Sequence, residues 1–229
     1  MGVYVCHLSS REHDPTEQLV EDPDTPERIV AIEQEMASLD WLGFDVLDAP
    51  VVTDAALERV HSKSHVEVLR KLAAAGGGPI DQDTFVGEAS FGAALHAAGG
   101  ACLMVDRLLG GEETVGFSGL RPAGHYAESA RAMGFCLFNN VAAAAESAIT
   151  EHGLERVFVL DWDVHPGNGT AEIFAAAQTC YSRASIRPGS TRAPVCSRTR
   201  APDQARATRS TCRFTRGPRG TPGSRCSSG

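Results

Sequence analysis

The chain has 229 residues, 42% of them hydrophobic and 22% charged, a composition typical of one globular α/β domain or a small pair of domains. Its formal net charge of −8 argues against a duplex-DNA binder, which needs a basic face. There is no apolar run of about 18 residues and no signal peptide pattern, and the seven cysteines lack a disulfide spacing, so we expect no membrane span and a cytoplasmic location.

Helical and extended patterns alternate along residues 1–178, which predicts an α/β fold with a parallel sheet flanked by helices. Short strands are expected at residues 3–6, 44–47 and 157–160, the last being the clearest. Helices are expected from Pro26 onward, over 54–74 after a cap at Thr53 and with a break near 62–64, over 90–109, and over the alanine-rich residues 135–149.

The strand expected at residues 157–160 runs directly into Asp161, Asp163 and His165. On an extended strand these side chains share one face, at the carboxyl end where parallel sheets bind ligands. Asp163 and His165 offer an oxygen and a nitrogen donor, a pair that suits Zn²⁺, Fe²⁺, Co²⁺ or Mn²⁺. Asp161 is expected to orient a neighbouring histidine or to bind a monovalent cation. The alternative is an aspartate that only caps the next helix.

A second polar segment, R121-PAGHYAESARAMGFCLFNN, places His125 after Gly124 in a loop. By itself this segment is typical of a surface loop with one solvated histidine. Combined with the acidic strand end, His125 becomes a candidate general base near a metal-activated water, with Asp161 as partner for its ring nitrogen.

These two segments resemble the histone deacetylase superfamily, which includes acetylpolyamine amidohydrolases and acetoin-utilisation proteins. Three further blocks, D24-TPERIVAI, R59-VHSKSHVEVLRKL and D81-QDTFVGEASFGAALHAAGG, match in family order, so the resemblance covers residues 1 to about 178. It implies an arginase/deacetylase fold and removal of acyl groups from amines with Zn²⁺ or Fe²⁺.

The resemblance also implies roles for individual residues. Asp163 and His165 would be two of three metal ligands, and His125 the first of a histidine pair beside the metal. Gly134 and Phe135 would line a narrow tunnel for an acylated side chain. Asp161 would hold a structural K⁺.

One position departs from the family pattern. Where the family has a second consecutive histidine, usually credited as the general acid/base, this chain has Tyr126. A tyrosine with a pKa near ~10 is a poor base at neutral pH, although it can still donate a hydrogen bond. Slow turnover, or a different substrate, is therefore expected even of a complete enzyme.

The composition changes abruptly at residue 179. Of the 21 basic and 29 acidic residues, residues 179–229 hold 11 arginines and one acid, Asp203, leaving 10 basic and 28 acidic residues in 1–178. The tail has no leucine, so it cannot build an ordinary core. We predict a disordered basic tail here.

The genetic code suggests how this tail arose. Codons allowed for residues 179–194, read two bases later, encode VLFASIHQAGLYPGT, a strand-like run of the kind expected after the metal motif. We therefore predict a change of reading frame near Gln178. It would leave the chain as an N-terminal half, truncated after the metal-motif strand, without the third metal ligand and the catalytic tyrosine, and so inactive.

Two other functions compete with a deacylating enzyme. A catalytically dead module of the same fold could bind acylated amines without hydrolysing them, and Tyr126 is the feature that favours it. A nucleic-acid-binding tail is disfavoured, because its arginines are interleaved with only Tyr181 and Phe214. We expect an acylated amine substrate (a polyamine, an acyl-lysine or a small metabolite), no nucleic acid or membrane partner, and leave a homo-oligomer open.

Overall fold

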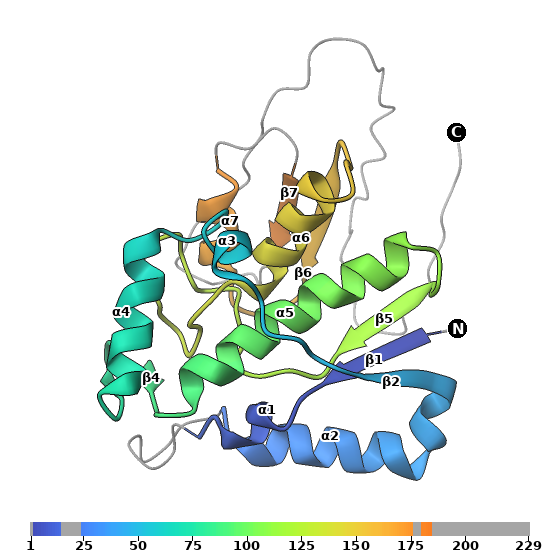
Figure 1. Ribbon diagram of the computed structural model, residues 1–229, viewed down its shortest axis with the longest axis horizontal. Coiled ribbons are helices and arrows are strands. Elements are labelled where there is room, and N and C mark those ends of the chain that lie inside the picture. The colour runs from blue at the N-terminus through green and yellow to red at the C-terminus, as the bar shows by residue number, and fades with distance from the viewer. Residues whose placement is uncertain (1, 15–23, 176–179, 185–229) are drawn as a thin grey trace, which may run out of the picture. The chain divides into compact units, whose positions relative to one another are not determined.

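A three-stranded parallel sheet forms the first part of the fold. The computed structural model describes residues 2–14, 24–175 and 180–184. Strands β1 (Gly2–Cys6), β2 (Phe44–Asp48) and β5 (Val115–Ser118) pair in the order β2-β1-β5 (Figure 1). Val3 lies opposite Asp45 on one side and Gly116 on the other. The expected parallel sheet is thus confirmed, and β5 is a strand that the sequence reasoning missed.

A second parallel pair carries the acidic strand. β6 (Val157–Asp161) pairs with β7 (Cys180–Ala184), with Val157 opposite Cys180 and Asp161 opposite Ala184. β7 therefore falls inside the segment predicted as a tail, while residues 185–229 lie outside the described residues. The proposed frame change near Gln178 also lies outside them. A small antiparallel pair, β3 (Gly78–Pro79) and β4 (Phe85–Val86), completes the described strands.

The described helices differ in how they begin, and a side chain caps the first turn of three of them. The helices are α1 (Ser9–Glu12), α2 (Pro26–Ser38), α3 (Asp54–Leu57), α4 (Lys63–Ala74), α5 (Ser90–Leu109), α6 (Asn140–Thr150) and α7 (Asn168–Ile173), with a 3₁₀ turn η1 (Asp40–Gly43). The break expected near 62–64 separates α3 from α4, because Thr53 caps the first and Ser62 caps the second. None of the described helices is both long and apolar enough to cross a bilayer.

The alanine-rich helix is shorter than expected at its start. We predicted residues 135–149, whereas α6 begins at Asn140. Gly134 and Phe135 both have a left-handed backbone conformation, with φ of 57° and 64°, so a right-handed helix cannot include them. The Asn139 side chain then accepts a hydrogen bond from Ala142 N and caps the helix. Residues 134–139 are consequently a loop, in which the side chains from Cys136 to Asn139 are buried and only Gly134 and Phe135 stay partly exposed.

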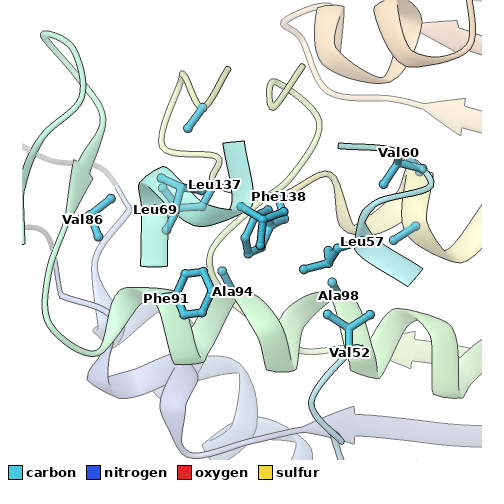
Figure 2. Close-up of a cluster of buried hydrophobic side chains, with 14 of the residues drawn as sticks. Val52, Leu57, Val60, Leu69, Val86, Phe91, Ala94, Ala98, Leu137 and Phe138 are labelled. Atoms are coloured by element: carbon cyan, nitrogen blue, oxygen red, sulfur yellow. The ribbon is translucent and has the colours of Figure 1, made fainter. Parts of the chain in front are cut away.

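The main core lies where α5 and α6 meet the α3–α4 segment. Leu57, Leu69, Leu137 and Phe138 are almost fully buried there, and Phe91 packs against the edge of Phe138 (Figure 2). From β6, Val157 and Val159 pack against this cluster. α5 contacts β1 and β5, whereas α6 contacts β6, so each of these two helices packs against a different sheet.

Candidate metal and catalytic site

The centre of the candidate site is a contact between His125 and Asp161, which lie 36 residues apart. His125 Nδ1 is 2.9 Å from Asp161 Oδ2, and both side chains are partly buried. Asp161 Oδ1 accepts a hydrogen bond from Asp163 N at 3.1 Å. With the shared proton on Nδ1, the second ring nitrogen of His125 is left as a proton acceptor.

Glycines make this approach possible. A Cβ on Gly167 would lie 2.3 Å from Asp161 Oδ2, and a Cβ on Gly169 would lie 2.3 Å from Ala127 O. Thr170 N donates to His125 O, which ties the start of α7 to the histidine backbone. The turn after the metal motif therefore does more than end the strand, since it lets α7 pack directly against the His125 loop.

Asp163 and His165 lie beyond the end of β6. We expected Asp161, Asp163 and His165 to alternate on one extended strand, but the strand ends at Asp161. Asp163 Oδ1 instead accepts from His165 N at 2.7 Å, and it lies 3.1 Å from His165 Nδ1. This local turn competes with the strand ladder, as aspartates at strand ends commonly do. The two side chains are exposed, Asp163 by 48% and His165 by 69%.

The electrostatics of Asp163 favour its charged form. Partial burial by itself would raise the pKa of this carboxyl, but the hydrogen bonds from His165 outweigh it and lower the pKa. The chain thus presents an ionised oxygen donor beside an imidazole nitrogen. The 3.1 Å between Asp163 Oδ1 and His165 Nδ1 is a hydrogen-bond distance, and a metal ion held by both atoms would replace that hydrogen bond.

The donor set is nevertheless incomplete. Within the described ranges, no group of three or more His, Cys, Asp or Glu side chains is placed to hold a metal ion. A catalytic zinc site needs three protein ligands and one open position. The assignment of Asp163 and His165 as two of three metal ligands therefore stays a prediction.

Tyr126 is packed beside the histidine that it follows. The two ring centroids are 4.2 Å apart. A Cβ on Gly134 would lie 2.4 Å from Tyr126 Cδ2, so the ring occupies the space that the glycine leaves free. Phe135 N donates to the buried Thr84 Oγ1. Gly134 and Tyr126 are thus brought together, while the tunnel expected around Phe135 stays a prediction.

Two residues that sequence reasoning missed hold this loop in place. The ring of His61 contacts Glu128 O through Nδ1 at 3.0 Å and accepts from Asn139 N through Nε2 at 2.9 Å. The Asn139 side chain donates to Ala127 O and Thr170 Oγ1, both at 3.1 Å. His61 lies within the R59-VHSKSH block that matched the family, but nothing local in that block reveals a partner about 70 residues away.

A buried ion pair anchors the start of the His125 loop. Arg121 Nε lies 2.9 Å from Asp24 Oδ1, and Arg121 Nη1 donates to Ser10 O and His13 O. A cavity of about 190 Å³ next to this pair is lined in part by Ile32 and Phe117. None of the predicted site residues lines it, so it does not correspond to the expected tunnel.

This parallel α/β arrangement, with an aspartate-paired imidazole beside an Asp–His donor pair at the end of a strand, is typical of hydrolases that act with a metal ion. The histone deacetylase domain model matches residues 22–185. The chain therefore belongs to the histone deacetylase family.

Relatives of known name agree with this assignment. The chain is 41% identical over 158 residues to a histone deacetylase-like amidohydrolase of Pseudomonas aeruginosa, covering 67% of this chain and 40% of that protein. It is 38% identical over 135 residues to the human polyamine deacetylase HDAC10, covering 56% of this chain and 20% of that protein.

A solved structure confirms the expected fold. The crystal structure of the HDA15 HD domain is similar with a TM-score of 0.76 and 32% identity, over 80% of this chain and 52% of that one. The chain thus spans about half or less of the length of these proteins.

Proposed function

We propose that the domain to which this chain belongs removes acyl groups from acylated amines by hydrolysis. The observation that carries the proposal is the 2.9 Å contact between His125 Nδ1 and Asp161 Oδ2, beside the Asp163–His165 donor pair. The relatives named as deacetylases and amidohydrolases support an amide substrate. One of them is named as a polyamine deacetylase, which makes an acylated polyamine a substrate to test first, ahead of an acyl-lysine or a small acylated metabolite.

In this proposal each residue has a limited task. Asp161 holds the His125 ring in one tautomer, so that the other ring nitrogen accepts a proton from the attacking water. Tyr126, at 4.2 Å between ring centroids, packs against that imidazole and has a hydroxyl with which to donate a hydrogen bond. Gly134 and Phe135 would border the path of the acyl chain.

Asp163 and His165 would hold the metal ion, Zn²⁺ or Fe²⁺, which supplies charge stabilisation and lowers the pKa of water. Asp161 is also a proposed ligand of a structural K⁺. Both of its oxygens already contact protein groups, His125 and Asp163 N, but a carboxylate oxygen has lone pairs for a further partner.

The 229-residue chain alone should bind metal weakly and should not turn over, because no three metal-binding side chains are grouped among the described residues. The test is equilibrium dialysis with Zn²⁺, together with hydrolysis of acetylspermidine and acetyl-lysine peptides by the purified chain. Stoichiometric metal with measurable hydrolysis would show that the half-site suffices and would contradict the proposed inactivity.

The enzyme activity itself is tested on a completed domain. A chimera joins residues 1–175 to the C-terminal part of the Pseudomonas aeruginosa amidohydrolase. We expect it to hydrolyse an acetylated amine, and we expect His125→Ala to abolish that activity. A folded chimera that binds metal and shows no hydrolysis of any of these substrates would reject the proposal.

A binding module without chemistry is the second candidate function, and Tyr126 is the residue that favours it. In the chimera, Tyr126→His should raise kcat by about 100-fold if only a general acid/base is lacking. Tyr126→Phe is the matched control, since it keeps the ring and removes the hydroxyl. Tight binding of acetylated amines with no turnover in either the parent or the Tyr126→His chimera would favour the binding module.

A further inference from the structure

We propose that Asn139 is a positioning residue that holds the backbone of His125 where its imidazole meets Asp161. The inference rests on the proposed function only in taking His125 as the group that accepts a proton. The hydrogen bonds that carry it do not depend on that function.

Asn139 is fully buried, and each polar atom of its side chain has a partner. Its Oδ1 accepts from Ala142 N at 3.0 Å, whereas its Nδ2 donates to Ala127 O and to Thr170 Oγ1, both at 3.1 Å. A backbone N–H must donate and a carbonyl oxygen must accept, so these partners fix which side-chain atom is the amide nitrogen. Serine or aspartate would cap a helix as well as asparagine does. The two donated hydrogen bonds therefore give Asn139 a task beyond capping α6.

The groups that Asn139 binds are the ones that hold the backbone of His125. Thr170 N donates to His125 O at 3.2 Å, so a single residue joins the Asn139 side chain to His125. Ala127 N donates to Gly124 O at 3.1 Å, which closes the turn that contains His125. Asn139 thereby binds both the end of this turn and the start of α7.

Close backbone packing leaves this arrangement little room to relax. A Cβ on Gly169 would lie 2.3 Å from Ala127 O and 2.5 Å from Tyr126 C, so the start of α7 touches the turn directly. In a close-packed interior, a displaced group moves its neighbours. A change at the Asn139 amide should therefore be passed on to the turn.

Asn139 is fixed from its other side by His61, whose Nε2 accepts from Asn139 N at 2.9 Å. From this held backbone, His125 Nδ1 comes within 2.9 Å of Asp161 Oδ2. A hydrogen bond weakens as its distance and angle depart from their best values. Loss of the two Asn139 donors should loosen this contact, and with it the single tautomer that the carboxylate imposes on His125.

The test is ¹⁵N NMR of the 229-residue chain labelled at its histidines, with His125→Gln to assign the His125 signals. At about pH 8, where a solvated imidazole is neutral, the parent should show one His125 tautomer, with Nδ1 protonated and Nε2 bare. Asn139→Asp keeps the oxygen that caps α6 and removes the two donors. We expect it to mix the two tautomers and to speed solvent exchange of the ring N–H by about 10-fold.

Thr170→Val removes one of the two acceptors and should cause a smaller change of the same kind. Thr53→Ala is the matched control, because it deletes an exposed threonine hydroxyl that caps α3, and it should leave the His125 signals unchanged. Unchanged His125 signals in a folded Thr170→Val chain would overturn the proposal, even where Asn139→Asp fails to fold. Equal changes in Thr53→Ala, or mixed tautomers in the parent, would overturn it as well.

Hydrolysis by the chimera separates this inference from the proposed function. In an active chimera, Asn139→Asp should lower kcat by about 10-fold and leave KM nearly unchanged, as expected when a proton acceptor is misplaced. A rise in KM with unchanged kcat would overturn the positioning role. A chimera that shows no hydrolysis, but in which Asn139→Asp still mixes the His125 tautomers, would instead reject only the proposed function.

Discussion

Acidification should weaken this fold through His61, an imidazole that is buried in its neutral form. The ring is 2% exposed and uses both nitrogens, one on Glu128 O and one on Asn139 N. A second buried imidazole, His65, lies 5.0 Å away between ring centroids. Burial, followed by the charge of His65, lowers the pKa of His61 from 6.5 to about 4.

The sign and size of the effect follow from proton linkage. The unfolded chain takes up a proton near pH 6.5 and the folded chain only near pH 4, so acid favours unfolding. The contribution is fully present above pH 6.5 and is lost progressively as the pH falls to about 4. Between about pH 7.5 and pH 5 the expected loss from His61 is about 2 kcal/mol. His13, whose pKa burial also lowers to about 4, adds a similar loss.

Urea unfolding followed by circular dichroism, from about pH 7.5 to pH 5, measures this loss. His61→Gln keeps one donor and one acceptor but cannot titrate. We expect it to be less stable than the parent at neutral pH and to lose about 2 kcal/mol less on acidification. His152→Gln removes a surface imidazole that pairs with Asp106 and should retain the acid-induced loss. If His61→Gln and the parent lose stability in parallel as the pH falls, the assignment of the acid sensitivity to His61 is refuted.

Four further outcomes can be checked directly. Arg121→Met should destabilise the chain by about 3–5 kcal/mol in urea unfolding, because it leaves the buried Asp24 carboxylate without its main partner. Gly169→Ala should cost on the order of 2 kcal/mol by the same measurement, because its Cβ meets the Ala127 carbonyl oxygen at 2.3 Å. Leu57→Ala, which removes a fully buried side chain, should lower stability by about 2–5 kcal/mol. Resequencing the gene across the codons for residues 170–190 should reveal a one- or two-base change that restores VLFASIHQ, and an unchanged frame would contradict the predicted frame change.

Local signals account for most of the fold that the sequence anticipated. The apolar spacing of residues 90–109, closed by a glycine pair, predicted the bounds of α5, and the break expected near 62–64 falls where the Ser62 side chain caps α4. β5 escaped notice because Gly116 interrupts a run of only four residues. That glycine is needed, since a Cβ there would lie 2.5 Å from Met104 Cγ of α5. The close packing of α5 on β5 therefore requires a glycine in this strand, although glycine has a low strand propensity.

At the candidate site too, the sequence predicted features that depend on neighbouring residues and missed contacts between distant segments. The spacing placed Asp163 and His165 on an extended strand, but that strand ends at Asp161 and a local turn follows it. The pairing of His125 with Asp161 could be proposed because both segments carry recognisable chemistry. The roles of His61 and Asn139 could not be predicted in the same way, because both residues act by closing the loop of residues 127–139. His61 accepts a hydrogen bond from Asn139 N at the end of that loop, and the Asn139 side chain donates to Ala127 O at its start. A histidine acquires such a role only through the partners that folding brings to it. For that reason the acid sensitivity of His61 is a sharper test of this structure than the metal motif itself.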